Sequence, residues 1–162
     1  MNSMKIFVIN PGSTSTKLAL YDGTTPVWAE SVYHPLAELA QFSRVNEQLE
    51  YRKQHVYSTL QKENIPLDFD VIIARGGLLK PTPGGVYRIT ERIKSDLWNA
   101  SMEHVSNLAA LIADDIAQRI GCPSFIADPV VTDELQDVAR LTGIPEIPRI
   151  SIFHTLNSRA VS

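Results

Sequence analysis

The stretch VINPGSTSTKLALYD, residues 8–22, decides the fold of this 162-residue chain. It joins two apolar runs, residues 6–9 and 17–21, through a segment of turn-forming and hydroxyl residues. That arrangement predicts a β-hairpin. A second turn over residues 22–26 leads into the branched and aromatic residues 27–33, which are typical of a third strand. We therefore expect three antiparallel strands at the start of the fold.

The middle of the chain carries a helical pattern and then a strand pattern. Apolar residues at three-, four- and seven-residue offsets predict one long amphipathic helix between Pro35 and Pro66. Residues 71–74 form a short apolar run that is typical of a buried strand. The loop that follows, residues 75–85, holds two Gly-Gly pairs and two prolines. A loop that leaves a buried strand in this way is a candidate for function.

The second half of the chain continues this alternation of helices and strands. Residues 90–99 predict a short helix with a threonine N-cap, and a second helix begins near Ser106 and ends at Gly121. Residues 124–127 are typical of a strand, and residues 132–140 predict a polar helix. An opening hairpin followed by alternating strands and helices predicts an α/β domain with a mixed sheet and flanking helices.

Composition narrows the class of protein and of partner. The 15 Lys+Arg and 18 Asp+Glu residues give a net charge of -3, which offers no electrostatic footprint for nucleic acid. Cys122 is the only cysteine, which suits a reducing compartment. No apolar run approaches the length of a signal-peptide core or of a membrane span. We expect a cytoplasmic protein that has no nucleic-acid and no membrane partner.

The hairpin tip contains the materials of a phosphate-binding turn. Gly12 allows a ligand to approach the backbone closely, residues 13–16 supply hydroxyl groups and amide donors, and Lys17 follows at the start of the next strand. The alternative is an ordinary turn rich in Ser and Thr. The segment has no Gly-Lys pair and no following helix, and GxGxxG is absent from the sequence. The P-loop and Rossmann interpretations therefore fail.

Four more side chains are candidates for anion or metal chemistry. Arg75 and Asp128 each follow an expected strand, where ligands of α/β sheets usually bind. An arginine there can hold a carboxylate or phosphate, and an aspartate can orient hydrated Mg²⁺. The alternatives are an arginine that bonds loop carbonyls and a plain Asp-Pro turn. His104 and His154 can donate at an anion site, although a lone histidine is more often structural.

These residues lie in blocks that carry a family resemblance. The opening stretch resembles the first phosphate hairpin of the acetate and sugar kinase, heat-shock chaperone and actin superfamily, whose fold is ribonuclease H-like. Within that superfamily, four further blocks resemble the butyrate kinases and branched-chain carboxylate kinases of the acetokinase family: ARGGLLKPTPGGVYRI, EHVSNLAALIADDIA, FIADPVVTDEL and RISIFHTLNSRAVS. The blocks run in family order and cover nearly the whole chain.

The resemblance implies an ATP-dependent phosphorylation of a short-chain carboxylate, with butyrate as the first candidate and Mg²⁺ required. The products would be an acyl phosphate and ADP. The residues agree with this chemistry, because a carboxylate is already ionised at pH 7 and needs no general base. An acetate or propionate kinase is an alternative that differs only in the acyl pocket, which Leu78-Leu79 and Val130-Val131 could shape.

The resemblance also assigns individual residues. The hairpin asparagine and the phosphate-facing turn would bind ATP: Asn10, Gly12, Ser13, Thr14, Ser15, Thr16 and Lys17. His104 and His154 match the two histidines beside the phosphoryl group, and Asp128 matches the aspartate that organises the metal. Arg75 departs from the acetate kinase pattern, which has a histidine before the Gly-Gly pair and an arginine where this sequence has Ile72. An anion-binding role for Arg75 therefore rests mainly on its position.

Enzymes of this family are built from two similar domains that hold the nucleotide between them. We expect residues 1–162 to be the N-terminal domain, one half of a duplicated two-domain kinase, without the C-terminal nucleotide-clamping domain. The isolated chain should then hold half of the active site and have little or no turnover. A non-catalytic ligand-binding or partner-binding remnant of the same fold is the alternative. A surface that the second domain would cover could also make the chain a homo-oligomer.

Overall fold

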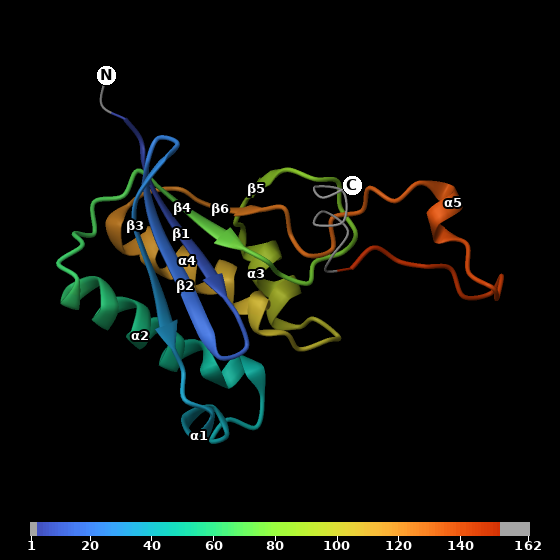
Figure 1. Ribbon diagram of the computed structural model, residues 1–162, viewed down its shortest axis with the longest axis horizontal. Coiled ribbons are helices and arrows are strands. Elements are labelled where there is room, and N and C mark those ends of the chain that lie inside the picture. The colour runs from blue at the N-terminus through green and yellow to red at the C-terminus, as the bar shows by residue number, and fades with distance from the viewer. Residues whose placement is uncertain (1–2, 153–162) are drawn as a thin grey trace.

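The computed structural model describes residues 3–152 and contains one mixed sheet with helices packed against it (Figure 1). The six strands are β1 (Lys5–Pro11), β2 (Ser15–Asp22), β3 (Thr25–Tyr33), β4 (Val71–Arg75), β5 (Val86–Arg88) and β6 (Ser124–Ala127). Their order in the sheet is β3-β2-β1-β4-β6-β5. β1, β4 and β6 run parallel to one another, and the other neighbours are antiparallel. The predicted α/β class and the three opening strands are confirmed.

Two helices, α2 (Leu49–Lys62) and α4 (Leu108–Ile120), pack against one side of this sheet. The other helices of the described residues are α1 (Leu36–Leu39), α3 (Glu91–Trp98) and α5 (Asp137–Arg140), with 3-10 turns η1 (Val45–Gln48) and η2 (Val105–Asn107). α4 packs on β1, β4 and β6, and Figure 1 shows it behind these strands, while α2 packs on β2 and β3. Within residues 3–152, the helices are too short or too polar to cross a membrane.

The core lies between α4 and the central strands. α4 is built on the apolar face that the sequence predicts, because Leu108, Ile112 and Ile116 are fully buried. They pack in one cluster with fully buried side chains of the parallel strands: Phe7, Ile9, Ile72 and Ile126. Side chains of alternate strand residues face the same side of a sheet, so this cluster fixes the orientation of all three strands.

Two helix boundaries follow from local chemistry, as predicted. The Thr90 hydroxyl accepts a hydrogen bond from the Ile93 amide at 3.3 Å and caps α3. Gly121 ends α4 in the left-handed conformation, with φ of 76°, and its amide donates to the Ala117 carbonyl. Both boundaries are set by neighbours in sequence, which is why the sequence reveals them.

The predicted single helix between Pro35 and Pro66 is wrong. The segment contains the one-turn helix α1, an irregular stretch, η1 and only then α2. The break occurs because the Glu47 carboxylate accepts from the amides of Ser43 and Arg44, which starts a new helical segment. The apolar positions keep a helical spacing through the break, so periodicity alone does not reveal it.

The segment after β6 also differs from the prediction. The expected helix over residues 132–140 is reduced to α5, because Thr132 is buried and its hydroxyl donates to the Pro129 carbonyl at 2.8 Å. α5 and the chain that follows it extend away from the sheet (Figure 1). The short strand β5 was not predicted, since three residues after a Gly-Gly pair carry too little pattern.

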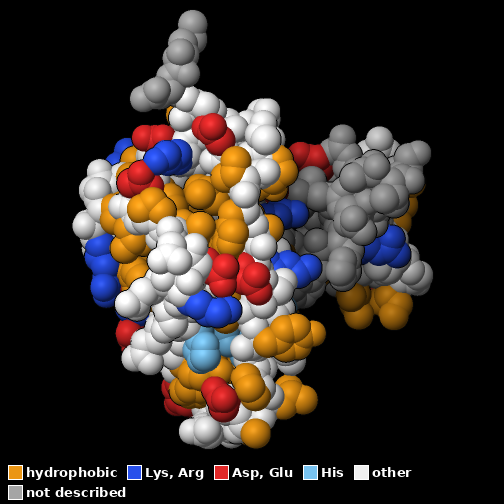
Figure 2. All heavy atoms as spheres, turned by 60° about the vertical axis from the view of Figure 1, so that its left-hand side comes forward, with side chains coloured by type: hydrophobic (Ala, Val, Ile, Leu, Met, Phe, Trp, Pro, Cys, Tyr) orange, Lys and Arg blue, Asp and Glu red, His pale blue; other side chains and the backbone are white. Residues whose placement is uncertain are grey.

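The β3 edge of the sheet is exposed. Val27 and Tyr33 have more than half of their surface accessible, and so does Leu36 just beyond the strand. Figure 2 views the side on which β3 and α2 lie and shows hydrophobic side chains in a band that charged residues flank. The carboxyl end of β3 lies beside the first hairpin, because Tyr33 pairs with Ser15 and the His34 amide donates to the Thr14 carbonyl.

Candidate active site

Three strands bring three predicted site residues to one edge of the sheet. Asn10 lies near the end of β1, Arg75 is the last residue of β4, and Asp128 directly follows β6. The register pairs Ile9 with Ala74 and Arg75 with Ala127. The carboxyl ends of the parallel strands therefore meet at the same edge, which is where ligands of α/β sheets bind.

The hairpin turn stands at this edge. It is shorter than the sequence indicates, because β1 continues to Pro11 and β2 begins at Ser15, which leaves only residues 12–14 between the strands. The Gly12 amide donates to the Ser15 carbonyl at 2.7 Å and closes the turn. Opposite Asn10 in the register is Lys17, and both side chains face a shallow hollow of about 370 Å³ on the sheet.

A buried arginine that was not predicted supports the turn from behind. Arg52 of α2 is 0% exposed, and its guanidinium reaches the hairpin. Nη1 donates to the Gly12 carbonyl at 3.0 Å, and Nη2 donates to the Ser13 carbonyl at 2.9 Å. Burial lowers the pKa of Arg52 to about 10, so the side chain stays charged at neutral pH. The hairpin is thereby attached to α2.

The side chain of Thr16 takes part in the same support. Thr16 is 0% exposed, and its Oγ1 accepts from Arg52 Nη1 at 3.2 Å and lies 2.8 Å from Nε2 of His34. The His34 amide donates to the Thr14 carbonyl. Burial, followed by the charge of Arg52 and by His55, lowers the pKa of His34 to about 4. The Thr16 hydroxyl is thus bonded inside the protein, and its role as a phosphate contact stays a prediction.

Arg75 and Asp128 are bonded to each other across the edge. Arg75 Nη1 donates to the Asp128 carbonyl at 2.8 Å, which is the loop contact that was the alternative to anion binding. Asp128 itself adopts a left-handed conformation with φ of 41°. Its Oδ1 accepts from the Gly85 amide at 2.8 Å, and its own amide donates to the Gly85 carbonyl. This double contact fixes the carboxylate at the end of β6.

The two Gly-Gly pairs let the loop of residues 75–85 approach its neighbours. A Cβ on Gly76, whose φ is 103°, would lie 2.6 Å from the Cβ of Ser106. A Cβ on Gly84 would lie 2.5 Å from Oε1 of Glu134 and 3.5 Å from Oδ1 of Asp128. The contact at Gly76 is too short for any side chain, because the Ser106 Cβ cannot move without the backbone, whereas the Glu134 carboxylate would have to move away from a side chain at residue 84. The first pair therefore packs on the turn that contains His104, and the second packs beside Asp128.

His104 is held at the start of η2. Its Nδ1 accepts from the Ser106 amide at 3.2 Å and lies 2.7 Å from the Ser106 hydroxyl. Because Nδ1 is an acceptor, we assign the proton of the neutral ring to Nε2. Burial lowers the pKa of His104. The preceding Glu103 accepts from Arg44 Nε at 2.6 Å, which fixes this turn to the start of η1. His154 lies outside the described residues.

Asp128 is the carboxylate that could hold a metal ion at the carboxyl ends of the parallel strands. Among residues 3–152, no group of three or more His, Cys, Asp and Glu side chains could hold a metal ion. Asp128 supplies one oriented carboxylate, with Oδ1 bonded to the Gly85 amide. A single carboxylate suits Mg²⁺, which keeps several of its waters and binds through few protein ligands plus substrate phosphates.

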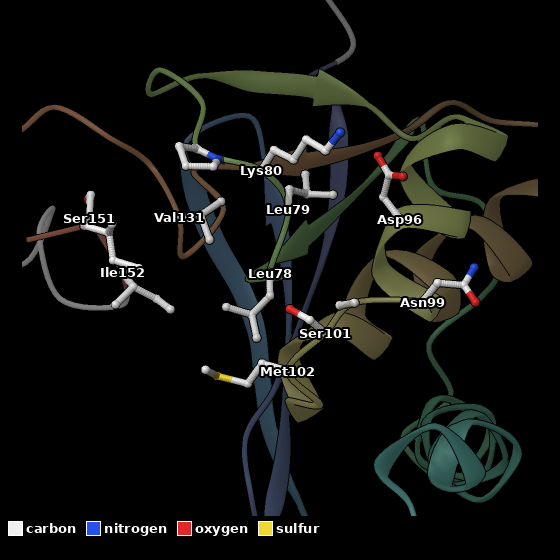
Figure 3. Close-up of a pocket in the computed structure, with 13 residues that line it drawn as sticks. Leu78, Leu79, Lys80, Asp96, Asn99, Ser101, Met102, Val131, Ser151 and Ile152 are labelled. Atoms are coloured by element: carbon white, nitrogen blue, oxygen red, sulfur yellow. The ribbon is translucent and has the colours of Figure 1, made fainter. Parts of the chain in front are cut away.

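An apolar pocket of about 450 Å³ opens beside the loop of residues 75–85 (Figure 3). Its apolar lining comes from separate segments: Leu78, Leu79, Met102, Val131, Ile150 and Ile152. Polar side chains also line it, among them Lys80, Asn99 and Ser101. Three of the four residues that the sequence suggested for an acyl pocket are present, and Val130 is not among the lining residues.

Comparison with known proteins shows what this chain is similar to. No family model matches the chain. The chain is 65% identical over 159 residues to a probable butyrate kinase of Phocaeicola vulgatus, which covers 98% of this chain and 45% of that protein. It is 44% identical over 160 residues to butyrate kinase 2 of Clostridium acetobutylicum, with the same two coverages of 98% and 45%. This chain is a homologue of the butyrate kinases.

This chain spans a little under half the length of these relatives. Its fold matches that of the crystal structure of Porphyromonas gingivalis acetate kinase, with a TM-score of 0.58 and 12% identity. That match covers 98% of this chain and 48% of the acetate kinase, and it shows the fold alone. The predicted ribonuclease H-like fold is therefore confirmed.

Proposed function

We propose that this chain is the N-terminal domain of a kinase that transfers the γ-phosphoryl group of ATP to a short-chain carboxylate, with butyrate preferred. One observation carries the proposal. A single edge of the sheet gathers the hairpin turn, Arg75 and Asp128, next to an apolar pocket of about 450 Å³. The family likeness over 98% of the chain supports this interpretation.

The chemistry needs positioning and charge neutralisation more than acid or base catalysis. A carboxylate nucleophile is ionised at neutral pH, so no group has to remove a proton. We assign the amide groups of Ser13 and Thr14 and the ammonium group of Lys17 to the phosphates of ATP. Asn10 lies beside Lys17 on the same face and is assigned to the transferred phosphoryl group.

His104 and Arg75 complete the set of donors. With Nδ1 of His104 bonded to the Ser106 amide, its Nε2–H group is the donor that we assign to a phosphoryl oxygen. A neutral imidazole can do this at pH 7, and the lowered pKa of His104 keeps the ring neutral. Arg75 uses Nη1 to hold the Asp128 carbonyl, and we assign the remainder of its guanidinium to an anion.

Asp128 is the residue that would hold Mg²⁺. Its Oδ1 is bonded to the Gly85 amide, so we assign Oδ2 to a water of the hydrated ion. The bound ion would neutralise negative charge on the phosphates of ATP. The contribution of the protein is to keep this carboxylate at the end of β6, which the two Gly85 contacts do.

The apolar pocket is assigned to the acyl chain of the substrate. Leu78, Met102 and Val131 come from three segments that surround the pocket in Figure 3. Apolar contacts discriminate weakly, because one methylene contributes only about 1–3 kcal/mol. We therefore expect a graded preference among short acyl chains and not an absolute one.

We assign the base and ribose of ATP to a second domain. The relatives are more than twice as long as this chain, and the match covers about 45% of their length. A nucleotide held between two domains leaves each isolated domain with half a site. The isolated chain should accordingly show little or no turnover.

The test is acyl hydroxamate formation from ATP, Mg²⁺ and a panel of acetate, propionate, butyrate and isobutyrate. It compares this chain with a chimera in which the remaining part of the Phocaeicola vulgatus relative follows it. We expect the chimera to form most product with butyrate or isobutyrate and the isolated chain to form almost none. Multiple turnovers by the isolated chain would contradict the half-site assignment.

Substitutions in the chimera test the assigned residues. His104→Ala and Asp128→Asn should each lower kcat by about 100-fold or more, because each removes a group that acts on the transferred charge. Asp137→Asn, at an exposed position of α5, is the matched control and should leave kcat unchanged. Unchanged kcat in both site variants would refute the assignment. A chimera that binds ATP but forms no acyl phosphate would favour the non-catalytic alternative.

A further inference from the structure

Arg52 makes an unusual set of contacts for a fully buried charged side chain. Its guanidinium bonds the carbonyls of Gly12 and Ser13, the hydroxyl of Thr16 and the side-chain oxygen of Gln48. All four acceptors are neutral. Among the residues that the structure describes, no carboxylate lies within ion-pair distance of Arg52. The protein thus keeps a buried positive charge directly behind the hairpin turn without a negative partner.

The geometry of the peptide bond gives these contacts a consequence for the opposite side of the turn. All described peptide bonds are trans, so the C=O and N–H groups of one peptide unit point in opposite directions. The carbonyls of Gly12 and Ser13 point toward Arg52. The N–H groups in the same two peptide units belong to Ser13 and Thr14, and they must point away from Arg52. Two consecutive amide donors are thereby directed outward from the turn.

Two adjacent amide N–H groups form a concave anion-binding site, and a positive charge behind them strengthens it. Water does not screen the guanidinium, because Arg52 is 0% exposed. An anion at the turn would therefore gain from the two amide donors and from the charge of Arg52. It would also supply the negative charge that the protein does not place near this arginine.

We infer that Arg52 is a positioning residue that directs the amide groups of Ser13 and Thr14 toward a phosphate group of the nucleotide. This inference rests on the proposed function, which assigns the turn to ATP. Arg52 does not touch the ligand and acts through the two carbonyls that it bonds. Its position in α2, 40 residues after Gly12, makes it a long-range support of the turn.

The test follows the backbone amide resonances of this chain by NMR during a titration with inorganic phosphate. In the parent chain, the Ser13 and Thr14 resonances should move more than the others. Arg52→Met should weaken phosphate binding at these amides about 10-fold or more, the loss expected when charge and hydrogen bonds are removed together. Arg52→Lys keeps the charge but not the two-armed geometry and should recover only part of the affinity.

Two comparisons separate positioning from general stability. Arg92→Met removes an exposed arginine of α3 that pairs with Asp96, and it should leave the phosphate affinity at the turn unchanged. Each Arg52 variant is scored only on the phosphate-induced shifts, with resonances of α4 as evidence that the fold is retained. If Arg52→Met does not fold, Arg52→Lys decides, because full parental affinity in that variant would overturn the inference.

The outcomes also distinguish this inference from the proposed function. No movement of the Ser13 and Thr14 resonances in the parent chain would remove the phosphate assignment of the turn, and the inference with it. Phosphate affinity at these amides that equals the parental value in folded Arg52→Met or in Arg52→Lys would overturn only the role of Arg52. Phosphate affinity that weakens in both Arg52 variants and is retained in Arg92→Met supports both.

Discussion

The two sides of the candidate active site are held in opposite ways. The hairpin turn of residues 12–14 is supported by side chains, since Arg52 bonds its carbonyls and Thr16 connects it to His34. The loop of residues 75–85 comes close to its neighbours at Gly76 and Gly84, because these glycines carry no side chains, and the Asp128 carboxylate bonds it at Gly85. The hairpin depends on buried side-chain hydrogen bonds, whereas the loop depends also on positions without a side chain.

This difference predicts how each side responds to substitution. Hydrogen-bonded side chains can be shortened, or protonated as the pH falls, and each change has a moderate cost. At Gly76 an added Cβ would lie 2.6 Å from the Ser106 Cβ, which cannot move without the backbone, so even alanine is disruptive there. The loop should therefore be the more sensitive side, and the hairpin should be the one that responds to pH.

The largest expected effect tests the loop. Gly76→Ala places a Cβ 2.6 Å from the Ser106 Cβ at a φ of 103°, so overpacking and backbone strain add up. We expect a loss of about 2–5 kcal/mol in the free energy of unfolding, measured with urea.

Two other glycines separate the two causes of that loss. Gly121 has a positive φ of 76°, but a Cβ added there would meet no described atom within 4 Å. Gly121→Ala should therefore lose about 1–2 kcal/mol in the free energy of unfolding. Gly143→Ala has neither feature among the described residues and should lose almost nothing. Equal losses in all three variants would show that close packing at Gly76 is not what holds the loop.

The next effect tests the hairpin through pH. The pKa of His34 falls from its ordinary value of 6.5 to about 4 in the folded state, because burial disfavours the charged ring. The unfolded chain then binds the proton more tightly than the folded chain does. This contribution to stability is complete above about pH 6.5 and is lost as the pH falls toward about 4, by up to about 3 kcal/mol.

The measurement compares urea unfolding of the parent chain and of His34→Gln between about pH 7 and about pH 4.5. Carboxylates titrate in both proteins, so the difference between the two slopes isolates His34. We expect the parent to lose more stability than His34→Gln over this range. Parallel slopes would mean that His34 is not held neutral behind the hairpin.

The smallest effect sharpens the comparison within the turn itself. Thr16→Val keeps the shape of the side chain and removes the hydroxyl that bonds Arg52 and His34. We expect a loss of about 1–3 kcal/mol, because buried donors lose a partner. Thr14→Val, at an exposed position of the same turn, should stay within about 0.5 kcal/mol of the parent. Chemical denaturation measures both, and equal losses would argue against side-chain support.

Much of the site can be predicted from the sequence because its elements are locally encoded. The apolar runs on either side of residues 10–16 predict the hairpin, and residues 71–74 and 124–127 predict the next two strands. Parallel strands then bring Arg75 and Asp128 to one edge without further information. The prediction of one long helix between Pro35 and Pro66 was wrong, because the helix is interrupted at Ser43. The interruption depends on a hydrogen bond to the Glu47 carboxylate, which leaves the apolar spacing intact.

The rest of the site has no local signal. Arg52 lies among other polar residues of a helix, and in the sequence it is indistinguishable from an exposed arginine. Its burial results from the packing of α2 beneath a hairpin 40 residues away. The close approach of Gly76 to Ser106 likewise requires β4 and η2 to be in place before the missing side chain matters.

The sequence by itself determined five of the six strands, the apolar face of α4, and the caps at Thr90 and Gly121. These features follow from the spacing of residue types within about 20 positions, and spacing is what a chain shows before it folds. The tertiary structure alone decided which buried polar groups meet. A hydrogen bond between distant residues depends on the final positions of two elements, and neither partner carries a mark of it in the sequence.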